Sequence, residues 1–297
     1  RLFEVFAAHD IEYFFYNGGG DSQDTTFKVS EMAKKLKFPL KCVGIPKTVD
    51  NDLPYTDCSP GFGSVAKYIA TSTLEAGLDV KSMAETSTKV FILEVMGRHA
   101  GWIAAASCLA ATKAGDPPHI ILLPEVPFEK TKFITQVKQT VKEQGYCVIV
   151  ASEGTQTKNG KFLADSGLTD AFGHKQLGGV APVLAGMISK IGLKNHWAVA
   201  DYLQRSARHI ASKTDLDQAY AVGEHAVKLA IAGKTALMPI IKRTSDSPYK
   251  WKIATAPLKN VANIEKTMPK KFISKNGFEI TQAGKTYLSP LIKGEAP

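Results

Sequence analysis

Five short apolar runs constrain the fold of this 297-residue chain more than any other feature. They are "EYFFYN" (residues 12–17), "LKCVGI" (40–45), "KVFILEV" (89–95), "HIILLP" (119–124) and "YCVIVAS" (146–152). Apolar runs of this length that do not alternate with polar residues are typical of strands buried on both faces. The sequence therefore predicts a sheet whose strands lie inside the protein.

The segments between these runs carry apolar residues at helical spacing. They span residues 27–36, 63–78, 97–114 and 130–143. Strands that alternate with helices favour a parallel sheet with right-handed crossovers and with helices on its faces. We therefore predict an α/β fold.

Glycines, prolines and charged residues follow the first four predicted strands. The segments are "NGGGDSQDT", "PKTVDND", "MGRHAG" and "PEVPFE". In parallel α/β sheets, ligands bind just beyond the carboxyl ends of the strands, and all four segments stand at such ends. The sequence thus predicts a ligand site built from these segments.

Composition narrows the class of partner. The net charge is +9, and the lysines are scattered without a ladder of aromatic and basic residues, which favours an anionic small substrate over nucleic acid. No run reaches the roughly 18 apolar residues of a membrane helix. The start of the chain lacks a signal-peptide pattern, so we expect a cytoplasmic protein with no membrane partner. The 4 cysteines are spread singly, which favours reduced thiols over metal ligands or disulfides.

The first glycine-rich segment allows two interpretations. Gly18, Gly19 and Gly20 would let backbone N–H groups approach an anion closely, as in phosphate sites at helix starts. Alternatively, the segment is a tight strand-to-helix turn in which Asp21 or Ser22 caps the helix.

The segment "PKTVDND" combines a lysine with two aspartates. Asp50 and Asp52 would be ordinary residues of a capped, salt-bridged turn. Together with Lys47, however, they also match the groups that phosphoryl transfer uses: a carboxylate base, a carboxylate beside Mg²⁺ and a cation. The spacing alone does not decide between these two interpretations.

Three further charged residues carry the same ambiguity. At a predicted helix start, the N–H groups of Gly97 and Arg98 and the Arg98 guanidinium would hold an anion, unless Gly97 only permits close helix–strand packing. Glu125, between two prolines, is either an acceptor for sugar hydroxyls or a loop charge. Arg205 is either a phosphate clamp or a surface arginine.

In this order, "GIPKTVDND", "EVMGRHAG", "PEVPFE" and "DYLQRS" resemble the motifs of the phosphofructokinase family, from about Leu2 to about Lys242. The resemblance implies a three-layer, Rossmann-like fold of two lobes with mostly parallel sheets and the acceptor sugar between them. It implies a phosphoryl-donor lobe at residues 1–60 and 203–250. Residues 61–202 and 251–297 would form the sugar-phosphate-binding lobe.

The resemblance also implies roles for single residues of the first lobe. Asp50 is similar to the base that takes the proton from the 1-hydroxyl of fructose 6-phosphate. Thr48 and Val49 belong to the same sugar-contacting segment, and Asp52 is similar to a carboxylate of the Mg²⁺ site.

For several further residues, the resemblance implies contacts with the sugar and its phosphate. Met96, Gly97 and Arg98 resemble the segment that holds the phosphate ester, and Arg98 would also stabilise the reacting charge. Glu125 resembles a carboxylate that binds sugar hydroxyls. The pair that would grip the 6-phosphate is Tyr202 and Arg205.

Two positions distinguish the phosphoryl donors of the family. ATP-using bacterial members resemble "GGDGS" and "PGTIDND", whereas diphosphate-using members carry aspartate in the first motif and lysine in the second. Asp21 and Lys47 therefore resemble the diphosphate type. The rest of the implied donor-binding loop consists of Gly18, Gly19 and Ser22.

The chain departs from the family pattern in three ways. One is that the spacing from the glycine-rich loop to Asp50 is longer than in the short bacterial enzymes. Gly20 stands where many relatives have a metal-binding aspartate, and a shift of one residue would put Asp21 there instead. The family's first glycine-rich loop should precede Arg1, so we expect an upstream segment.

The expected reaction is reversible phosphoryl transfer from diphosphate to fructose 6-phosphate, with Mg²⁺, in glycolysis or gluconeogenesis, by a homodimer or homotetramer. An ATP-dependent 6-phosphofructokinase and a non-catalytic sugar-phosphate-binding subunit are the alternatives. A dinucleotide-binding oxidoreductase is disfavoured because no GxGxxG follows a predicted strand.

Overall fold

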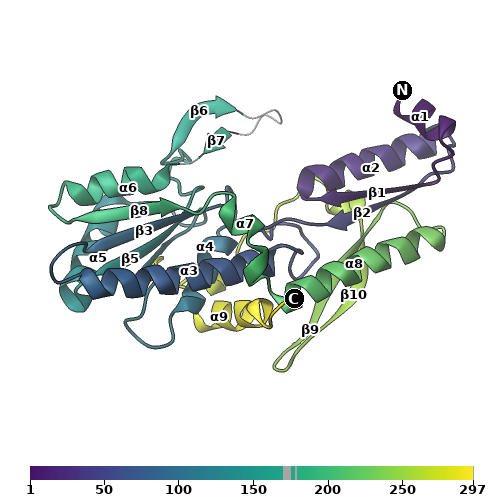
Figure 1. Ribbon diagram of the computed structural model, residues 1–297. Coiled ribbons are helices and arrows are strands. Elements are labelled where there is room, and N and C mark those ends of the chain that lie inside the picture. The colour runs from purple at the N-terminus through teal and green to yellow at the C-terminus, as the bar shows by residue number, and fades with distance from the viewer. Residues whose placement is uncertain (170–174, 178, 297) are drawn as a thin grey trace. The chain divides into compact units, whose positions relative to one another are not determined.

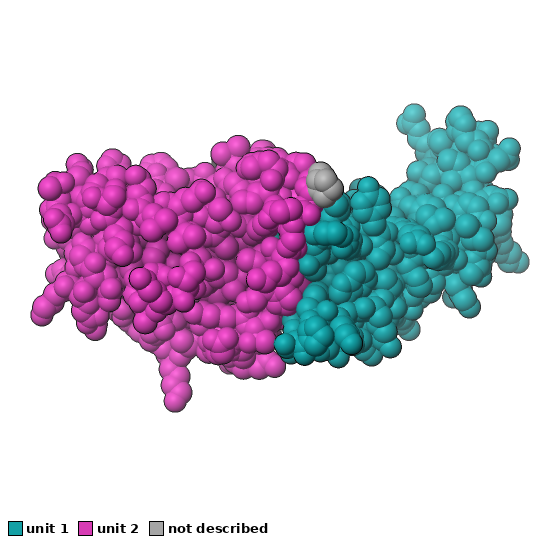
Figure 2. Space-filling model, turned by 60° about the horizontal axis from the view of Figure 1, so that its bottom comes forward, with its two compact units in different colours: residues 1–63, 213–266 teal, residues 64–212, 267–297 magenta. Residues whose placement is uncertain are grey.

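The structure is a computed structural model that describes residues 1–169, 175–177 and 179–296. The chain divides into two compact units, which Figure 2 colours separately. Unit 1 comprises residues 1–63 and 213–266, and unit 2 comprises residues 64–212 and 267–297.

Among its described residues, unit 1 contains four strands, three α-helices and one short 3-10 helix. In chain order they are α1 (Leu2–Ala8), β1 (Tyr13–Gly18), α2 (Gly20–Lys35), β2 (Lys41–Pro46), α8 (Lys213–Ile231), β9 (Leu237–Asp246), β10 (Tyr249–Pro257) and η3 (Leu258–Asn260). The strand order is β1-β2-β9-β10, with β1, β2 and β9 parallel and β10 antiparallel to β9.

Helices cover both faces of the unit 1 sheet (Figure 1). Alternate residues of a strand point to opposite faces. Accordingly, Cys42 of β2 packs in a cluster with Val29 and Ala33 of α2. The next residue, Val43, packs with Ala226 of α8. These contacts give unit 1 the three layers that the sequence predicts.

Strand β1 differs from its predicted environment. The prediction that it is buried on both faces is wrong, because Tyr13, Phe15 and Tyr16 have exposed fractions of 45%, 36% and 41%. Within the described residues β1 is an edge strand that pairs only with β2. Its apolar side chains therefore lack part of the cover that a central strand has.

Unit 2 contains the second parallel sheet. Its elements are α3 (Phe62–Met83, which begins at the end of unit 1), β3 (Val90–Val95), α4 (Trp102–Ala106), η1 (Ser107–Ala110), β4 (Ile120–Leu122), α5 (Lys130–Gln144), β5 (Cys147–Ser152), β6 (Asp165–Thr169), β7 (Lys175–Leu177), α6 (Val180–Ser189), β8 (Asn195–Val199), α7 (Leu203–Ser206), η2 (Arg208–Ile210), η4 (Lys270–Phe272), α9 (Gln282–Leu288) and η5 (Ser289–Ile292). The order β4-β5-β3-β8 is parallel throughout, and β6 and β7 form a separate antiparallel pair.

This sheet is also covered on both faces. Ile149 of β5 packs with Phe133 of α5 and Leu184 of α6 on one face. Its neighbour Val148 packs with Val80 of α3 on the other face. The predicted three-layer α/β fold with mostly parallel sheets is thus confirmed, although the five predicted strands are shared between two sheets rather than gathered in one.

The helix predicted over residues 97–114 begins later than expected. Gly97 has a φ of +129°, which no α-helical residue adopts, and α4 starts only at Trp102. The segment from Met96 to Gly101 is therefore a loop, and α4 is short and continues into a 3-10 turn.

The observed units differ from the family-based division chiefly at two segments. Residues 203–212, placed with residues 1–60, lie in unit 2. Residues 251–266, placed with residues 61–202, lie in unit 1. The reason is that β10 pairs with β9 along nearly its whole length. The roles assigned to the two lobes stay predictions. No helix in the described part of the chain combines the length and the apolar content that a membrane span requires.

Candidate functional site

In unit 1, the carboxyl ends of β1 and β2 bring two predicted site segments together. Gly18 pairs with Pro46 at the end of the ladder, and the Lys47 N–H group donates to the Gly18 carbonyl at 3.1 Å. A Cβ atom on Gly18 would lie 2.1 Å from Ser22 Oγ, so this position has no room for a side chain. The glycine-rich turn and the start of "PKTVDND" are therefore neighbours.

The glycine-rich turn leads directly into α2. Gly19 is the N-cap residue and has no side chain, so neither Asp21 nor Ser22 caps the helix as the turn interpretation expected. Both residues instead lie in the first turn, where Asp21 is exposed. A helix start without a side-chain cap presents N–H groups that bind anions well. This geometry favours the phosphate interpretation of the segment.

The loop after β2 is anchored around a buried asparagine. Asn51 lies between Asp50 and Asp52, is fully buried and has a left-handed φ of +54°. Its Oδ1 atom accepts a hydrogen bond of 3.0 Å from the Ser59 N–H group. The Asp50 N–H group donates to Thr48 Oγ1 at 3.2 Å. The two aspartates therefore leave a fixed backbone in defined directions.

Asp52 has the chemistry of a cation ligand. Its Oδ1 atom is buried without a hydrogen-bond partner among the described residues. Burial, together with the neighbouring Asp50 carboxylate, raises the pKa of Asp52 to about 6. Within the described residues, no group of three or more His, Cys, Asp or Glu side chains is arranged to hold a metal. Mg²⁺ usually needs only one or two protein carboxylates besides water and phosphate oxygens, so Asp52 fits such a site.

Cations secure the far end of this loop. Arg243 of β9 donates to the Asp57 carboxylate at 2.9 Å. Lys266 Nζ lies 3.0 Å from the Thr56 carbonyl oxygen and 2.9 Å from that of Asp57. Burial lowers the pKa of Lys266 to about 8, which still leaves most molecules with a charged ammonium at pH 7.

In unit 2, the loop after β3 is held by side chains from other segments. The Met96 N–H group donates to Gln204 Oε1 at 3.3 Å, which joins the predicted "DYLQRS" segment to the end of β3. The Gly97 N–H group donates to Glu153 Oε1 at 3.3 Å, and Ser152 Oγ donates to the Gly97 carbonyl. The protein itself therefore satisfies the Gly97 N–H group in this structure, and the predicted contact of this group with a ligand stays a prediction.

Glu125 closes the same loop at its other end. Both of its carboxylate oxygens accept from the Gly101 N–H group, at 3.0 and 3.1 Å. Oε1 also accepts from the Met268 N–H group at 3.0 Å. The carboxylate thus ties two backbone segments together. Its predicted contact with sugar hydroxyls stays a prediction.

Glu153 is a candidate that the sequence reasoning missed. It directly follows β5 and lines a cavity of about 130 Å³ together with Met96, Asp201 and Gln204. Burial raises its pKa, and the Gly97 N–H group and the nearby Arg98 guanidinium oppose this rise. The signal was present in the sequence, since Glu153 and Gly154 follow the fifth apolar run as the other charged and glycine-containing segments follow theirs.

Arg205 and Tyr202 lie together at α7. The guanidinium carbon is 4.0 Å from the centroid of the tyrosine ring, within the range of a cation–π contact. Tyr202 has an exposed fraction of 62%. The ring thus supports the arginine at a solvent-accessible position, as a phosphate-binding side chain requires.

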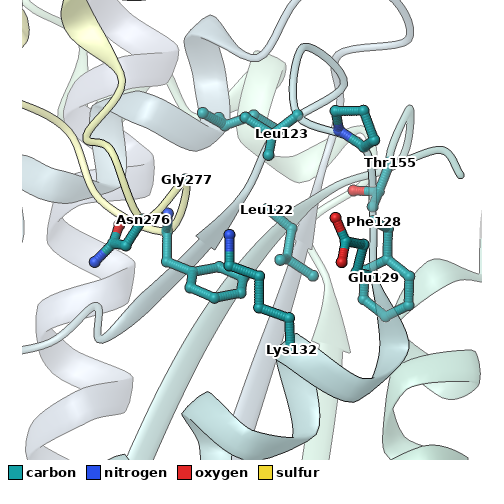
Figure 3. A pocket seen from close by; sticks show the side chains of 11 residues that line it. Leu122, Leu123, Phe128, Glu129, Lys132, Thr155, Asn276 and Gly277 are labelled. Carbon is teal, nitrogen blue, oxygen red and sulfur yellow. Dashed lines mark hydrogen bonds between the residues drawn. The ribbon is translucent and has the colours of Figure 1, made fainter. Parts of the chain in front are cut away.

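A separate small pocket of unit 2 lies between β4, α5 and the segment 276–278 (Figure 3). Leu122, Phe128 and Glu129 line it, and Lys132 Nζ lies 5.3 Å from the Phe278 ring centroid. Its volume of about 20 Å³ holds little more than one water molecule, so it is not a substrate site.

Comparison with known proteins agrees with this fold and these loops. The sequence model described as Phosphofructokinase matches residues 1–230. The chain belongs to the phosphofructokinase family.

Its relatives within the family include enzymes named for a particular donor. The chain is 66% identical to the pyrophosphate–fructose 6-phosphate 1-phosphotransferase of Halomonas elongata, over 99% of this chain and 71% of the relative. It is 61% identical to the enzyme of the same name from Methylococcus capsulatus, over 99% of this chain and 70% of the relative. The crystal structure of the pyrophosphate-dependent phosphofructokinase from Marinobacter aquaeolei matches with a TM-score of 0.91 and 62% identity, over 99% of this chain and 71% of that one.

Proposed function

We propose that this chain transfers a phosphoryl group reversibly from diphosphate to the 1-hydroxyl of fructose 6-phosphate, giving fructose 1,6-bisphosphate and phosphate. The observation that carries the proposal is that Lys47 and the Asp50–Asp52 loop stand beside the uncapped start of α2. This is the arrangement of a base, a cation and an anion cradle in one unit. The names of the relatives, at 58–66% identity, support diphosphate over ATP as the donor.

In the proposed mechanism, unit 1 supplies the reacting groups. Asp50 accepts the proton of the sugar 1-hydroxyl as that oxygen attacks the terminal phosphorus of diphosphate. The bond to the bridging oxygen then breaks and phosphate leaves. Lys47 and the N–H groups at the start of α2, with Gly18, Gly19 and Ser22 in the same turn, stabilise the negative charge of the donor.

Asp52 is the proposed protein ligand of Mg²⁺, because its buried Oδ1 atom has no other partner within the described residues. Asp21, exposed in the first turn of α2, is the second candidate. Mg²⁺ would supply charge neutralisation on the donor oxygens.

Unit 2 supplies the proposed contacts to the sugar phosphate. Arg98 and Arg205 are suited to bidentate binding of the phosphate ester. Glu153 has one Oε1 contact to a backbone N–H group and borders a cavity, whereas both oxygens of Glu125 already accept such bonds. We therefore propose Glu153 as a further hydroxyl-binding carboxylate beside the predicted Glu125.

Steady-state assays of the complete polypeptide with diphosphate and with ATP, side by side, test the donor. At saturating fructose 6-phosphate and Mg²⁺, we expect turnover with diphosphate to exceed turnover with ATP. Equal or faster turnover with ATP would reverse the donor assignment. Sugar-phosphate binding without turnover on either donor would instead favour a non-catalytic subunit.

The expected cytoplasmic homodimer or homotetramer is also part of this proposal. Light scattering of the purified protein measures the assembly, and a monomer at assay concentration would contradict it.

A further inference from the structure

Lys266 makes an unusual set of contacts within unit 1. Its backbone N–H group donates to the Asp52 carbonyl at 2.6 Å. Its ammonium nitrogen lies 3.0 Å from the backbone carbonyl oxygen of Thr56 and 2.9 Å from that of Asp57. It also lies 3.4 Å from Asn51 Oδ1. An ammonium group carries three N–H donors, and here all three acceptors belong to one loop. This single residue therefore contacts the loop at four points.

The loop needs donors from outside because it has little regular structure of its own. Residues 49–60 form neither helix nor strand, and only Thr48 makes an isolated bridge, to Gly61. A buried carbonyl oxygen without a hydrogen-bond donor destabilises the folded state. Lys266 supplies to Thr56 and Asp57 the hydrogen bonds that a strand or helix would otherwise supply.

The contact to Asn51 reaches the reacting part of the loop. Asn51 has the left-handed backbone conformation that asparagine tolerates better than most residues, and it separates Asp50 from Asp52. Its Oδ1 atom is shared between Lys266 Nζ and the Ser59 N–H group. A shift of Asn51 would therefore change the direction of both neighbouring carboxylates.

The other charges near this ammonium do not replace it. Arg243 donates hydrogen bonds to the carboxylates of Asp57 and Asp246. The carboxylates that face Lys266, those of Asp52 and Asp57, stabilise its charge and donate nothing to the backbone when ionised.

We infer that Lys266 is a positioning residue, which holds the Asp50–Asp52 segment in the conformation that phosphoryl transfer requires. Its catalytic consequence rests on the proposed function, whereas its hold on the loop does not. Lys266 acts through Asn51 and the backbone and is assigned no contact with substrate.

Lys266→Met, which keeps the length of the side chain and removes its donors, tests the inference in the complete protein. Lys259→Met is the matched control, because Lys259 is exposed in the same unit. We expect amide hydrogen exchange of residues 50–59 to become about tenfold faster only in Lys266→Met, since an anchored loop opens more often without its anchor. We expect kcat to fall by about 10²-fold, as for a misplaced catalytic group, with little change in the KM for fructose 6-phosphate.

Lys266→Gln retains two N–H donors on its side-chain amide. We expect its exchange rates in residues 50–59 and its kcat to lie between those of the wild type and Lys266→Met. If the methionine variant does not fold, the glutamine variant replaces it in the test. If the wild-type protein turns over neither donor, the proposed function fails while the exchange measurement still decides whether Lys266 anchors the loop. Wild-type exchange in residues 50–59 in a folded variant overturns the inference. A fall in stability with an unchanged kcat overturns its catalytic part.

Discussion

The two units hold their predicted site loops with charges of opposite sign. In unit 1 the loop carries the acidic residues Asp50 and Asp52, and its anchor is the Lys266 ammonium. In unit 2 the loop carries Arg98, and its anchors are the carboxylates of Glu125 and Glu153. Each loop is thus fixed by groups that attract, rather than repel, its functional side chain.

This difference follows from what each loop leaves unsatisfied. The acidic loop of unit 1 presents carbonyl oxygens, which need donors, so a cation satisfies it. The loop after β3 presents the N–H groups of Gly97 and Gly101, which need acceptors, so carboxylates satisfy it. The sign of the anchor is therefore set by the backbone, and the functional charge is stabilised as a consequence.

The largest expected effect is the loss of the base in unit 1. Asp50→Ser should reduce kcat by at least about 10²-fold, because general-base catalysis contributes that much. Binding of fructose 6-phosphate, measured by calorimetry, should be largely retained. Asp79→Ser, at an exposed position of α3, is the control. Near-normal turnover of Asp50→Ser would remove Asp50 from the role of base.

Removing an anchor of unit 2 should cost stability instead. Glu125→Leu leaves the N–H groups of Gly101 and Met268 without their acceptor, and we expect a loss of about 2 kcal/mol in the free energy of unfolding. Urea unfolding measures it, with the exposed Glu129→Leu as control. If stability is unchanged while the KM for the sugar rises, Glu125 is a substrate ligand rather than an anchor.

Lys47 tests the functional charge of unit 1 separately from its anchor. Lys47 is exposed at the end of β2, so Lys47→Gly should leave stability almost unchanged. Turnover with diphosphate should fall by about tenfold, the equivalent of one charge-assisted hydrogen bond. Residual turnover with ATP, measured on the same preparation, should not fall. An equal loss with both donors would contradict the donor assignment.

The smallest expected effect is a pH dependence from Glu153. Burial raises its pKa above the model-peptide value of 4.5, so the folded state holds this proton at pH values where the unfolded state has lost it. The contribution of Glu153 to stability should therefore decrease as the pH rises from 4.5 to the raised pKa. The glutamine of Glu153→Gln cannot ionise. In urea unfolding, the free energy of unfolding of this variant should therefore increase relative to that of the wild type between pH 4 and pH 7. A constant difference across this range would contradict the raised pKa.

The strands and loop ends were predictable because their signals are local. Each apolar run forms a strand near its predicted limits. The polar segment that follows each strand begins at the carboxyl end of that strand. Strands β9 and β10 were missed because "LMPIIKRTSD" and "YKWKIATAP" carry charged residues within the run. In the second half of β9, exposed residues alternate with half-buried ones, as in an antiparallel pair with one face open to solvent.

The anchors were less accessible to sequence reasoning. Lys266 lies more than 200 positions from its partners Thr56 and Asp57, and those partners are backbone carbonyls that every residue possesses. Glu125 likewise binds a backbone N–H group, that of Met268, which the sequence does not distinguish from the other backbone N–H groups. Spacing identifies side chains that follow a strand, but only the folded chain shows which distant residue satisfies a given backbone group.

The edge of β1 has a consequence for residues 1–297 when they are prepared by themselves. Within the described residues, one side of β1 has no strand partner, and Tyr13, Phe15 and Tyr16 stand exposed along it. An open strand edge with aromatic side chains is a template to which an extended segment adds through main-chain hydrogen bonds. The described chain, prepared alone, should therefore tend to self-associate and aggregate through β1, and a lysine introduced at position 13 or 15 should raise its solubility.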